Sequence, residues 1–154
     1  MRAVNFIRLL GMLALTSVLL TGCGKKEEGV GRYGMLDENT PEYTAVRFMR
    51  SIYLESDIDV AVSLSTPRLA RVLKKYHTNR NVQRHLLNLK YDSVAITPES
   101  SNSVGRSEFS EQATITLFFT GHYNDNKIED LRRVDLIRMN GDWKVEKIHP
   151  DHFM

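Results

Sequence analysis

Apolar residues recur at intervals of three and four after residue 40, which is the period of an α-helix with one buried face. The first such segment begins at Thr40-Pro41-Glu42, where a hydroxyl can cap the helix, proline fits the first helical position and an acid lies in the first turn. Its apolar stripe consists of Ala45, Phe48, Met49, Ile52 and Tyr53. The pattern predicts a helix from Pro41 to about Ser56.

Two shorter helices are predicted next, each introduced by a capping residue. Asp57 or Asp59 can cap the first of them, and Thr66 followed by Pro67 can cap the second. Residues 77–79 predict a break, after which a further helical stretch begins. The apolar residues that these three segments would bury are Val60, Ala61, Leu64, Leu69, Val72, Leu73, Tyr76, Val82, Leu86, Leu87 and Leu89.

The apolar period changes to two at residue 91, which is the period of a β-strand. Strands are predicted over residues 91–97, 112–123, 128–139 and 143–148. In the second strand, one face carries Ala113, Ile115, Leu117 and Phe119, and the other carries Thr114, Thr116, Phe118, Thr120 and His122. Turn residues at 124–127 and at Asn140-Gly141 join consecutive strands as hairpins. Helices followed by hairpin-connected strands predict an α+β fold, with the helices on one face of an antiparallel sheet of about four strands.

The N-terminal segment has the pattern of an export signal. Arg2 and Arg8 precede an apolar run over residues 9–20, which fits the roughly 7–15 residues of a signal segment and is shorter than the ~20 that span a bilayer. The sequence Leu20-Thr21-Gly22-Cys23 then resembles the lipobox of bacterial lipoproteins. This resemblance implies that residues 1–22 are removed and that Cys23 is acylated, with diacylglycerol on its thiol and a fatty acid such as palmitate on its amine. The acyl chains would anchor the protein to a membrane.

Residues 23–40 are the expected flexible tether between this anchor and the folded domain. Gly29, Gly31 and Gly34 are interspersed with charges, and no helical or alternating period is present. Gly24 follows the acylated cysteine. In the sorting rule that the lipoprotein resemblance implies, a residue other than aspartate at this place directs the protein to the outer membrane. We therefore expect a domain held at the outer membrane and facing the periplasm.

The folded part, residues 41–154, resembles the nuclear transport factor 2-like fold, a superfamily that includes ketosteroid-isomerase-like enzymes. The order of the elements carries this resemblance over about residues 41–149, together with the closing sequence Asn-Gly-Asp-Trp-Lys-Val-Glu-Lys-Ile at residues 140–148. The resemblance implies a strongly curved sheet that wraps the helices into a cone. The open end of such a cone can hold a small molecule.

Composition and charge exclude several classes of function. The 154-residue chain has a formal charge of +2, but without Arg2 and Arg8 it has 19 basic residues against 19 acidic ones. A neutral mature protein gives no electrostatic reason to bind nucleic acid. Cys23 is the only cysteine, which excludes an intrachain disulfide and makes folding depend on a packed core.

Polar residues on the inner sheet face are the candidate site, and we expect Tyr91, His122, Tyr123 and Asp135 there. In the isomerase relatives a carboxylate abstracts a proton while a tyrosine stabilises the oxyanion, so the resemblance offers Asp135, Tyr91 and His122 for catalysis. A register shift of one residue would place Asp135 in water, and three arginines within three residues of it favour a solvated face. The residues expected to contact a ligand are Tyr91, Phe118, His122 and Tyr123.

Two further groups of residues carry side chains suited to binding. His149, Asp151 and His152 have side chains that zinc prefers, but they lie beside Pro150 at the C-terminus, and no third and fourth ligand is evident. No metal site and no cofactor is predicted. The predicted third helix carries a basic face, which is either an ordinary solvated surface or a site for anionic lipid head groups or an acidic polymer. Its cations are Arg68, Arg71, Lys74 and Lys75, with Arg80 and Arg84 after them.

We therefore expect a binding module rather than an enzyme. The module would bind a small apolar ligand in the cone, or an envelope protein against an exposed sheet patch that includes Phe118. The resemblance also offers a homodimer through the outer sheet face, which nothing in the sequence decides. An isomerase-like or dehydratase-like enzyme stays open as a different class of function, and so does a structural role in envelope assembly or stress.

Overall fold

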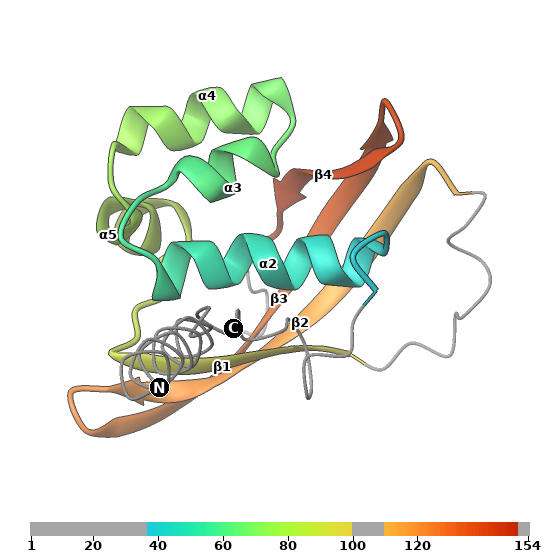
Figure 1. Ribbon diagram of the computed structural model, residues 1–154. Coiled ribbons are helices and arrows are strands. Elements are labelled where there is room, and N and C mark those ends of the chain that lie inside the picture. Colours follow the sequence, from blue (N-terminus) through green and yellow to red (C-terminus); the bar gives the residue numbers. More distant parts are fainter. Residues whose placement is uncertain (1–36, 100–109, 151–154) are drawn as a thin grey trace, which may run out of the picture.

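The computed structural model describes residues 37–99 and 110–150, so the predicted signal segment, Cys23 and most of the tether lie outside the described residues. Helices pack on one face of a four-stranded antiparallel sheet (Figure 1), which confirms the α+β class. The helices are α2 (Pro41–Leu54), α3 (Asp59–Ser63), α4 (Pro67–Tyr76), α5 (Asn79–Asn81) and the π-helix η3 (Val82–Leu86). The strands are β1 (Ser93–Pro98), β2 (Gln112–Tyr123), β3 (Asn126–Met139) and β4 (Asp142–Ile148). Among the described helices, none has the length and apolar character needed to cross a bilayer.

Helix α2 forms the centre of the core. Thr40 caps it as predicted, because its hydroxyl accepts a hydrogen bond from the amide of Tyr43 at 3.3 Å, and Pro41 is the first helical residue. The helix contacts all four strands. Its fully buried side chains include Ala45, Val46, Phe48, Met49 and Ile52. Since burying one large apolar side chain contributes about 1.5–3 kcal/mol, this helix face is a major source of stability. The helix ends at Leu54, two residues before the predicted end.

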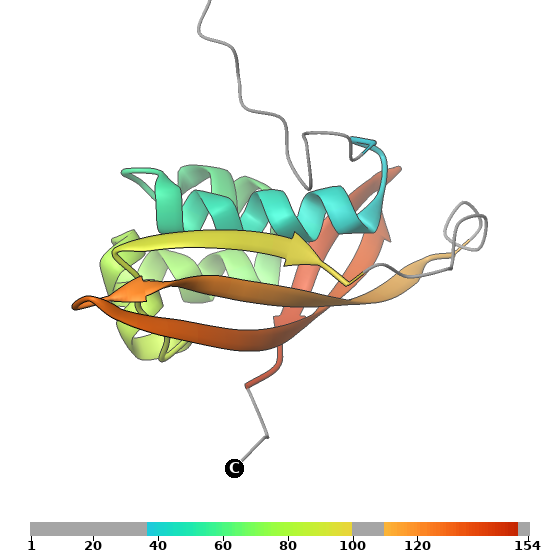
Figure 2. The same cartoon turned by 90° about the horizontal axis from the view of Figure 1, so that it is seen from below.

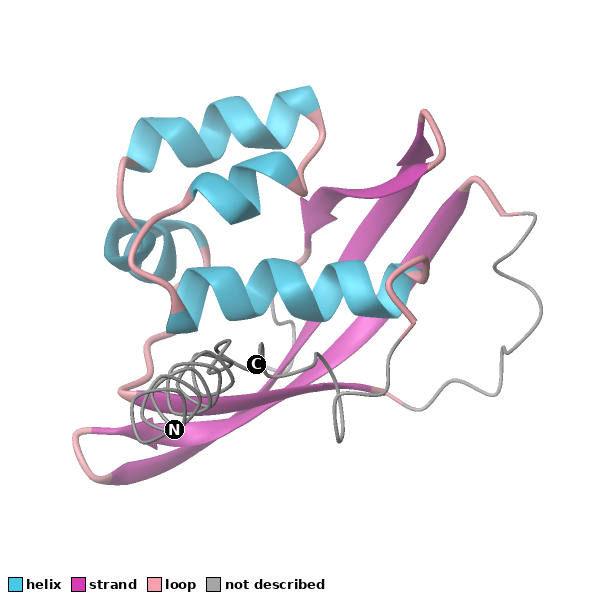
Figure 3. Cartoon of the chain, in the orientation of Figure 1, coloured by secondary structure: helices cyan, strands magenta, loops and turns pink. Residues whose placement is uncertain are grey.

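Helices α3 and α4 lie on the side of α2 away from β1, and α4 also contacts β4 (Figure 3). The carboxylate of Asp57 accepts a hydrogen bond from the amide of Asp59 at 3.0 Å, but the N-cap position of α3 is Ile58. Helix α4 begins as predicted, because the hydroxyl of Thr66 accepts a hydrogen bond from a first-turn amide. It ends at Tyr76, and the next residue, His77, has a φ of +62° that stops the helix inside the predicted break.

The stretch predicted as a further helix is irregular. After the single turn of α5, the amide that follows η3 donates to the carbonyl of Val82, five residues earlier, at 3.0 Å. The side-chain amide of Gln83 donates to the carbonyl of Ile52 in α2 at 2.7 Å, so this turn is bonded to the end of α2 rather than only to itself. Asn88, with a φ of +49°, ends the helical geometry, and Leu89 is buried beyond it.

The strands form a meander in the order β1-β2-β3-β4. Strand β2 has its predicted bounds, and β3 begins two residues earlier than predicted. The β2–β3 turn needs only Asn124 and Asp125, whose φ values of +49° and +61° suit a two-residue hairpin. Asn140 and Gly141, with φ values of +54° and +93°, form the second two-residue hairpin turn, as predicted.

The sheet has an inner face against α2 and an outer face away from the helices (Figure 2). On β2, Ile115, Leu117, Phe119 and Gly121 are buried on the inner face, whereas Thr114, Phe118, Thr120 and His122 are exposed on the outer face. The connection between α3 and α4 covers one sheet edge. The amide of Thr66 donates to the carbonyl of Val145 in β4 at 2.9 Å, and the amide of Val145 donates to the carbonyl of Leu64 at 2.8 Å.

Candidate functional site

Two charged side chains, Asp130 and Arg132, lie on the inner face of β3. They stand opposite the buried residues Phe119 and Leu117 in the register of the sheet, and directly opposed residues share a face. The two side chains form an ion pair, with 16% of the Asp130 side chain and 7% of the Arg132 side chain exposed. A largely buried ion pair inside an apolar core is uncommon unless its groups are well bonded.

Arg132 also connects the sheet to the chain after η3. Its guanidinium donates to the carbonyl of Leu131 at 2.7 Å and lies 3.5 Å from the carbonyl of Leu87. These bonds give the arginine partners on two sides, so its place between β3 and the 87–91 segment is fixed. Sequence reasoning missed both members of the pair, although the alternation of β3, counted back by twos from the apolar Val134, places Arg132 and Asp130 on the core side.

Two tyrosines lie beside the ion pair, and we call the four residues Tyr53, Tyr91, Asp130 and Arg132 the polar cluster. Tyr53 comes from α2, and its hydroxyl donates to the carbonyl of Leu89 at 3.0 Å. Tyr91 lies just before β1, with its ring stacked on Phe119 at a centroid distance of 6.3 Å. The Tyr53 ring meets both of these rings edge-on, at centroid distances of 5.7 Å and 5.8 Å. The cluster therefore has one apolar wall made of three aromatic rings.

Gly121 makes room for this arrangement. A Cβ atom at this position would lie 2.7 Å from Cδ1 of Tyr91 and would also collide with the carbonyl oxygen of Ser93. Any other residue would push the Tyr91 ring or the β1 backbone away from β2. Glycine is therefore required for the close approach of Tyr91 to the sheet.

The hydroxyl of Tyr91 is the exceptional atom of the polar cluster. It is buried and has no hydrogen-bond partner in the described part of the chain. Burial raises the pKa of Tyr91 to about 12, with the Asp130 carboxylate raising it further and the Arg132 guanidinium opposing the rise. Burial also raises the pKa of Tyr53, as do Tyr91 and Asp130, while Arg132 again opposes. Both phenols are therefore neutral near pH 7 and are hydrogen-bond donors rather than bases.

This geometry suits binding better than proton transfer. Asp130 is engaged by Arg132, so it is not a free general base. The neutral hydroxyl of Tyr91 is a donor suited to an oxygen or nitrogen acceptor, and the Tyr53, Tyr91 and Phe119 rings make its surroundings apolar. An unsatisfied buried hydroxyl costs about 1–3 kcal/mol, and an acceptor at this atom would remove that cost.

No protein-family model, curated protein or solved structure matches this chain. Its function is therefore inferred from the site itself.

Of the four residues expected on the inner sheet face, Tyr91 belongs to the polar cluster. Tyr123 is half-buried, and the ammonium of Lys90 lies 5.7 Å from its ring centroid. His122 does not face inward, and this expectation was wrong. It lies on the exposed outer face because it alternates with the buried Gly121 on the same strand. Tyr123 and His122 are adjacent and so have opposite facings.

Asp135 also lies on the outer face, which is the solvated position that its neighbouring arginines favoured. It pairs in register with Thr114, whose hydroxyl donates to Oδ1 of Asp135 at 2.8 Å. His149 Nε2 lies 2.5 Å from the other carboxylate oxygen, Oδ2. Partial burial would raise the pKa of Asp135, but the hydrogen bonds from His149 and Thr114 and the charges of His149 and Lys147 hold it below its usual value. The carboxylate is thus an ionised partner in a surface network and is separate from the polar cluster.

The remaining candidates are Phe118, an expected ligand contact, and the C-terminal side chains considered as metal ligands. Phe118 lies on the outer face with 41% of its surface exposed, opposite Thr97 on β1 and Leu131 on β3. Asp151 and His152 lie outside the described residues. Within the described ranges, His, Cys, Asp and Glu side chains form no group of three or more that could hold a metal ion.

Proposed function

We propose that this protein is a lipid-anchored periplasmic lipoprotein of the outer membrane whose domain binds a small apolar ligand that carries a hydrogen-bond acceptor. The buried hydroxyl of Tyr91, which has no hydrogen-bond partner among residues 37–99 and 110–150, lies beside the Asp130–Arg132 ion pair and carries this proposal. The aromatic wall of the polar cluster supports an apolar ligand body. The resemblance of element order to the nuclear transport factor 2-like fold supports a cone-shaped site, since relatives of that fold hold small molecules.

The lipobox supports the membrane anchor. Acylation at Cys23 would hold the domain near the lipid, and Gly24 favours the outer membrane. The tether, residues 23–40, would give an average reach of about 20–25 Å, so that a bound ligand would be held close to the membrane surface.

A ligand screen with a matched pair of variants tests the binding site. Small apolar compounds with a carbonyl group are screened by the shift that they cause in the melting temperature of the full chain. Tyr91→Phe removes only the hydroxyl, and we expect it to weaken the binding of each hit by about tenfold, as expected for one hydrogen bond. Tyr43→Phe removes a hydroxyl in the first turn of α2, outside the polar cluster, and should leave binding unchanged. If the hits bind Tyr91→Phe as tightly as they bind the unaltered chain, the polar cluster is not their site.

The exposed side chain of Phe118 favours a second candidate function, which is contact with an envelope protein through the outer sheet face. Cross-linking in intact envelopes compares the unaltered chain with Phe118→Ser and with Thr120→Ala, its neighbour on the same face. Loss of a cross-linked product only in Phe118→Ser supports a protein contact there, and a product of twice the chain mass would identify a homodimer. We do not propose an isomerase-like reaction, because Asp135 lies away from the polar cluster.

A further inference from the structure

The chain between Asp59 and Asp92 has a strongly one-sided charge. It contains no acidic residue, whereas the rest of the chain has 14 of the 21 basic residues and all 19 acidic ones. The seven basic residues of this stretch are Arg68, Arg71, Lys74, Lys75, Arg80, Arg84 and Lys90. A chain with a formal charge of only +2 therefore has one strongly basic segment.

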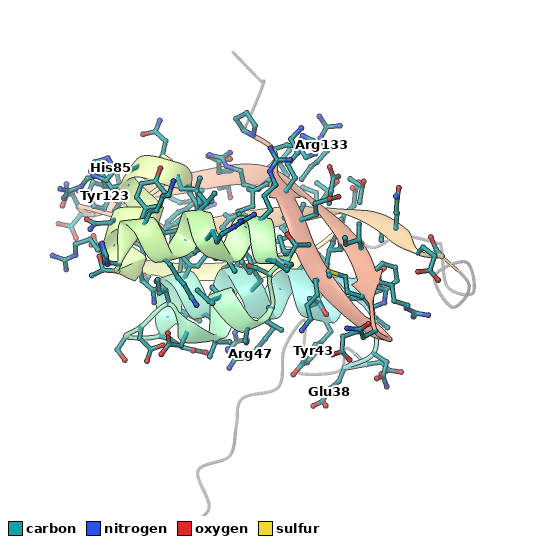
Figure 4. The ribbon with its side chains drawn as sticks, turned by 90° about the horizontal axis from the view of Figure 1, so that it is seen from above. Glu38, Tyr43, Arg47, His85, Tyr123 and Arg133 are labelled. Atoms are coloured by element: carbon teal, nitrogen blue, oxygen red, sulfur yellow. The ribbon has the colours of Figure 1, made fainter. Side chains whose placement is uncertain are left out.

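The fold places six of these side chains in solvent, and we call them the basic face: Arg68, Arg71, Lys74, Lys75, Arg80 and Arg84. Four of them lie on α4, the outermost helix, which faces the viewer in Figure 4. Leu69 and Leu73 bury the opposite side of this helix, so the cations of α4 are turned away from the core. The side chains of the basic face make no ion pair and no hydrogen bond within residues 37–99 and 110–150.

The spacing of the basic face suits an extended anionic surface better than a single anion. Arg68 and Lys75 are two turns apart on one side of α4, a separation of about 10 Å along the helix axis. Arg80 and Arg84 continue the basic face onto α5 and η3. The cations are thus spread over a helix surface instead of converging on one point. Tyr76 is half-buried and stacks on His85 at 6.4 Å, so the face has no freely exposed aromatic ring for stacking on nucleic-acid bases.

We propose that the basic face docks on anionic phospholipid head groups. Each lysine or arginine near an anionic membrane strengthens binding by roughly fivefold, and six unpaired cations are enough for reversible attachment. The proposal rests on the proposed lipid anchor in one respect, because the tether after Cys23 would keep the basic face within reach of lipid. Docking would then fix the orientation of the domain, with the helical layer toward the membrane and the outer sheet face away from it.

Vesicle partitioning tests this proposal without acylation. The full chain carrying Cys23→Ser is titrated with vesicles of phosphatidylcholine alone and of phosphatidylcholine with phosphatidylglycerol. R71Q/K75Q removes two cations of the basic face, and K127Q/R133Q removes two exposed cations from the sheet. All variants share the N-terminal apolar run, so its contribution cancels when their partition constants are compared.

We expect R71Q/K75Q to weaken partitioning into phosphatidylglycerol vesicles by about twenty-fold, and K127Q/R133Q to weaken it by less than about twofold. High salt should remove the difference between the two variants. Equal partitioning of the two variants would overturn the proposal. Tighter binding to soluble polyglutamate than to the anionic vesicles would also overturn it, because the face would then belong to an acidic polymer. Neither result changes the Tyr91 ligand test, so a failure here is distinct from a failure of the ligand site.

Discussion

The Tyr91 ring lies against Gly121 so closely that a Cβ atom on Gly121 would be 2.7 Å from Cδ1 of Tyr91. This relationship between a loop residue and the inner face of β2 positions the aromatic wall of the polar cluster. It also makes the polar cluster sensitive to the smallest change of side chain.

Gly121→Ala should therefore lower the free energy of unfolding by about 1–3 kcal/mol, the usual cost of forcing an extra carbon into a packed site. Urea denaturation followed by circular dichroism measures the loss. Thr120→Ala, the adjacent substitution on the exposed face, should stay within about 0.5 kcal/mol of the unaltered chain. Equal effects of the two substitutions would show that neither the Ser93 carbonyl nor the Tyr91 ring restricts the side chain at position 121.

Removing the hydroxyl of Tyr53 and removing the hydroxyl of Tyr91 should have different effects on the free energy of unfolding. Tyr53→Phe breaks the bond to the carbonyl of Leu89 and should destabilise the protein by about 1 kcal/mol. Tyr91→Phe removes a buried hydroxyl that has no partner in the described chain, so its stability should be unchanged or higher. Urea denaturation measures both changes in the free energy of unfolding. An equal loss in Tyr91→Phe and Tyr53→Phe would mean that the Tyr91 hydroxyl does have a hydrogen-bond partner.

Removing one member of the Asp130–Arg132 pair should lower the free energy of unfolding more than replacing both members. Arg132→Met leaves a buried carboxylate without its guanidinium and should cost about 3–5 kcal/mol. Adding Asp130→Asn to it removes the uncompensated charge and should recover part of this loss. Arg133→Met changes the next residue, which is exposed, and should have little effect. Similar unfolding energies for Arg132→Met and Arg133→Met would show that the ion pair does not hold the sheet to the 87–91 segment.

The network of Asp135 predicts a loss of stability in acid. Because the pKa of Asp135 is lower in the folded protein than in the unfolded chain, its contribution is complete above the unfolded value and is lost as the pH falls through the folded value. Thermal melts should show the loss beginning below about pH 4. Asp135→Asn should reduce the fall of the melting temperature with decreasing pH. Glu146→Gln, which replaces an exposed carboxylate, should leave that fall unchanged.

The membrane anchor is tested by labelling cells with radioactive palmitate. The unaltered chain should incorporate label and fractionate with the outer membrane, and Cys23→Ser should incorporate none. Gly24→Asp should keep the acylation but move the protein to the inner membrane. A Cys23→Ser protein that has lost residues 1–22 and still binds membranes would contradict the lipid anchor.

Local patterns predicted most of the fold because the elements depend on neighbours in the chain. The Thr40 and Thr66 caps, the Asn140-Gly141 turn and the alternation on β2 are all determined by short stretches. The π-turn of η3 was not predictable in this way, since it is bonded to the distant carbonyl of Ile52.

The candidate site was harder to predict than the fold. The alternation of β3 places Asp135 on the outer face, between the buried residues Val134 and Leu136. The outer face of β3 also carries the apolar residues Leu131 and Ile137, so this pattern was ambiguous in the sequence. The error for His122 was of a different kind, because the sequence already placed His122 on the face of β2 opposite the apolar residues. Asp130 and Arg132 were missed since charged residues are rarely expected in a core.

The backbone bonds that Leu64 and Thr66 make to Val145 have a consequence for self-association. An open strand edge is a template on which another molecule can add a strand. Here the chain occupies that template on β4 with its own α3–α4 connection. A second molecule that approached this edge would therefore find Val145, the middle residue of β4, already bonded, which hinders the addition of a continuous strand there.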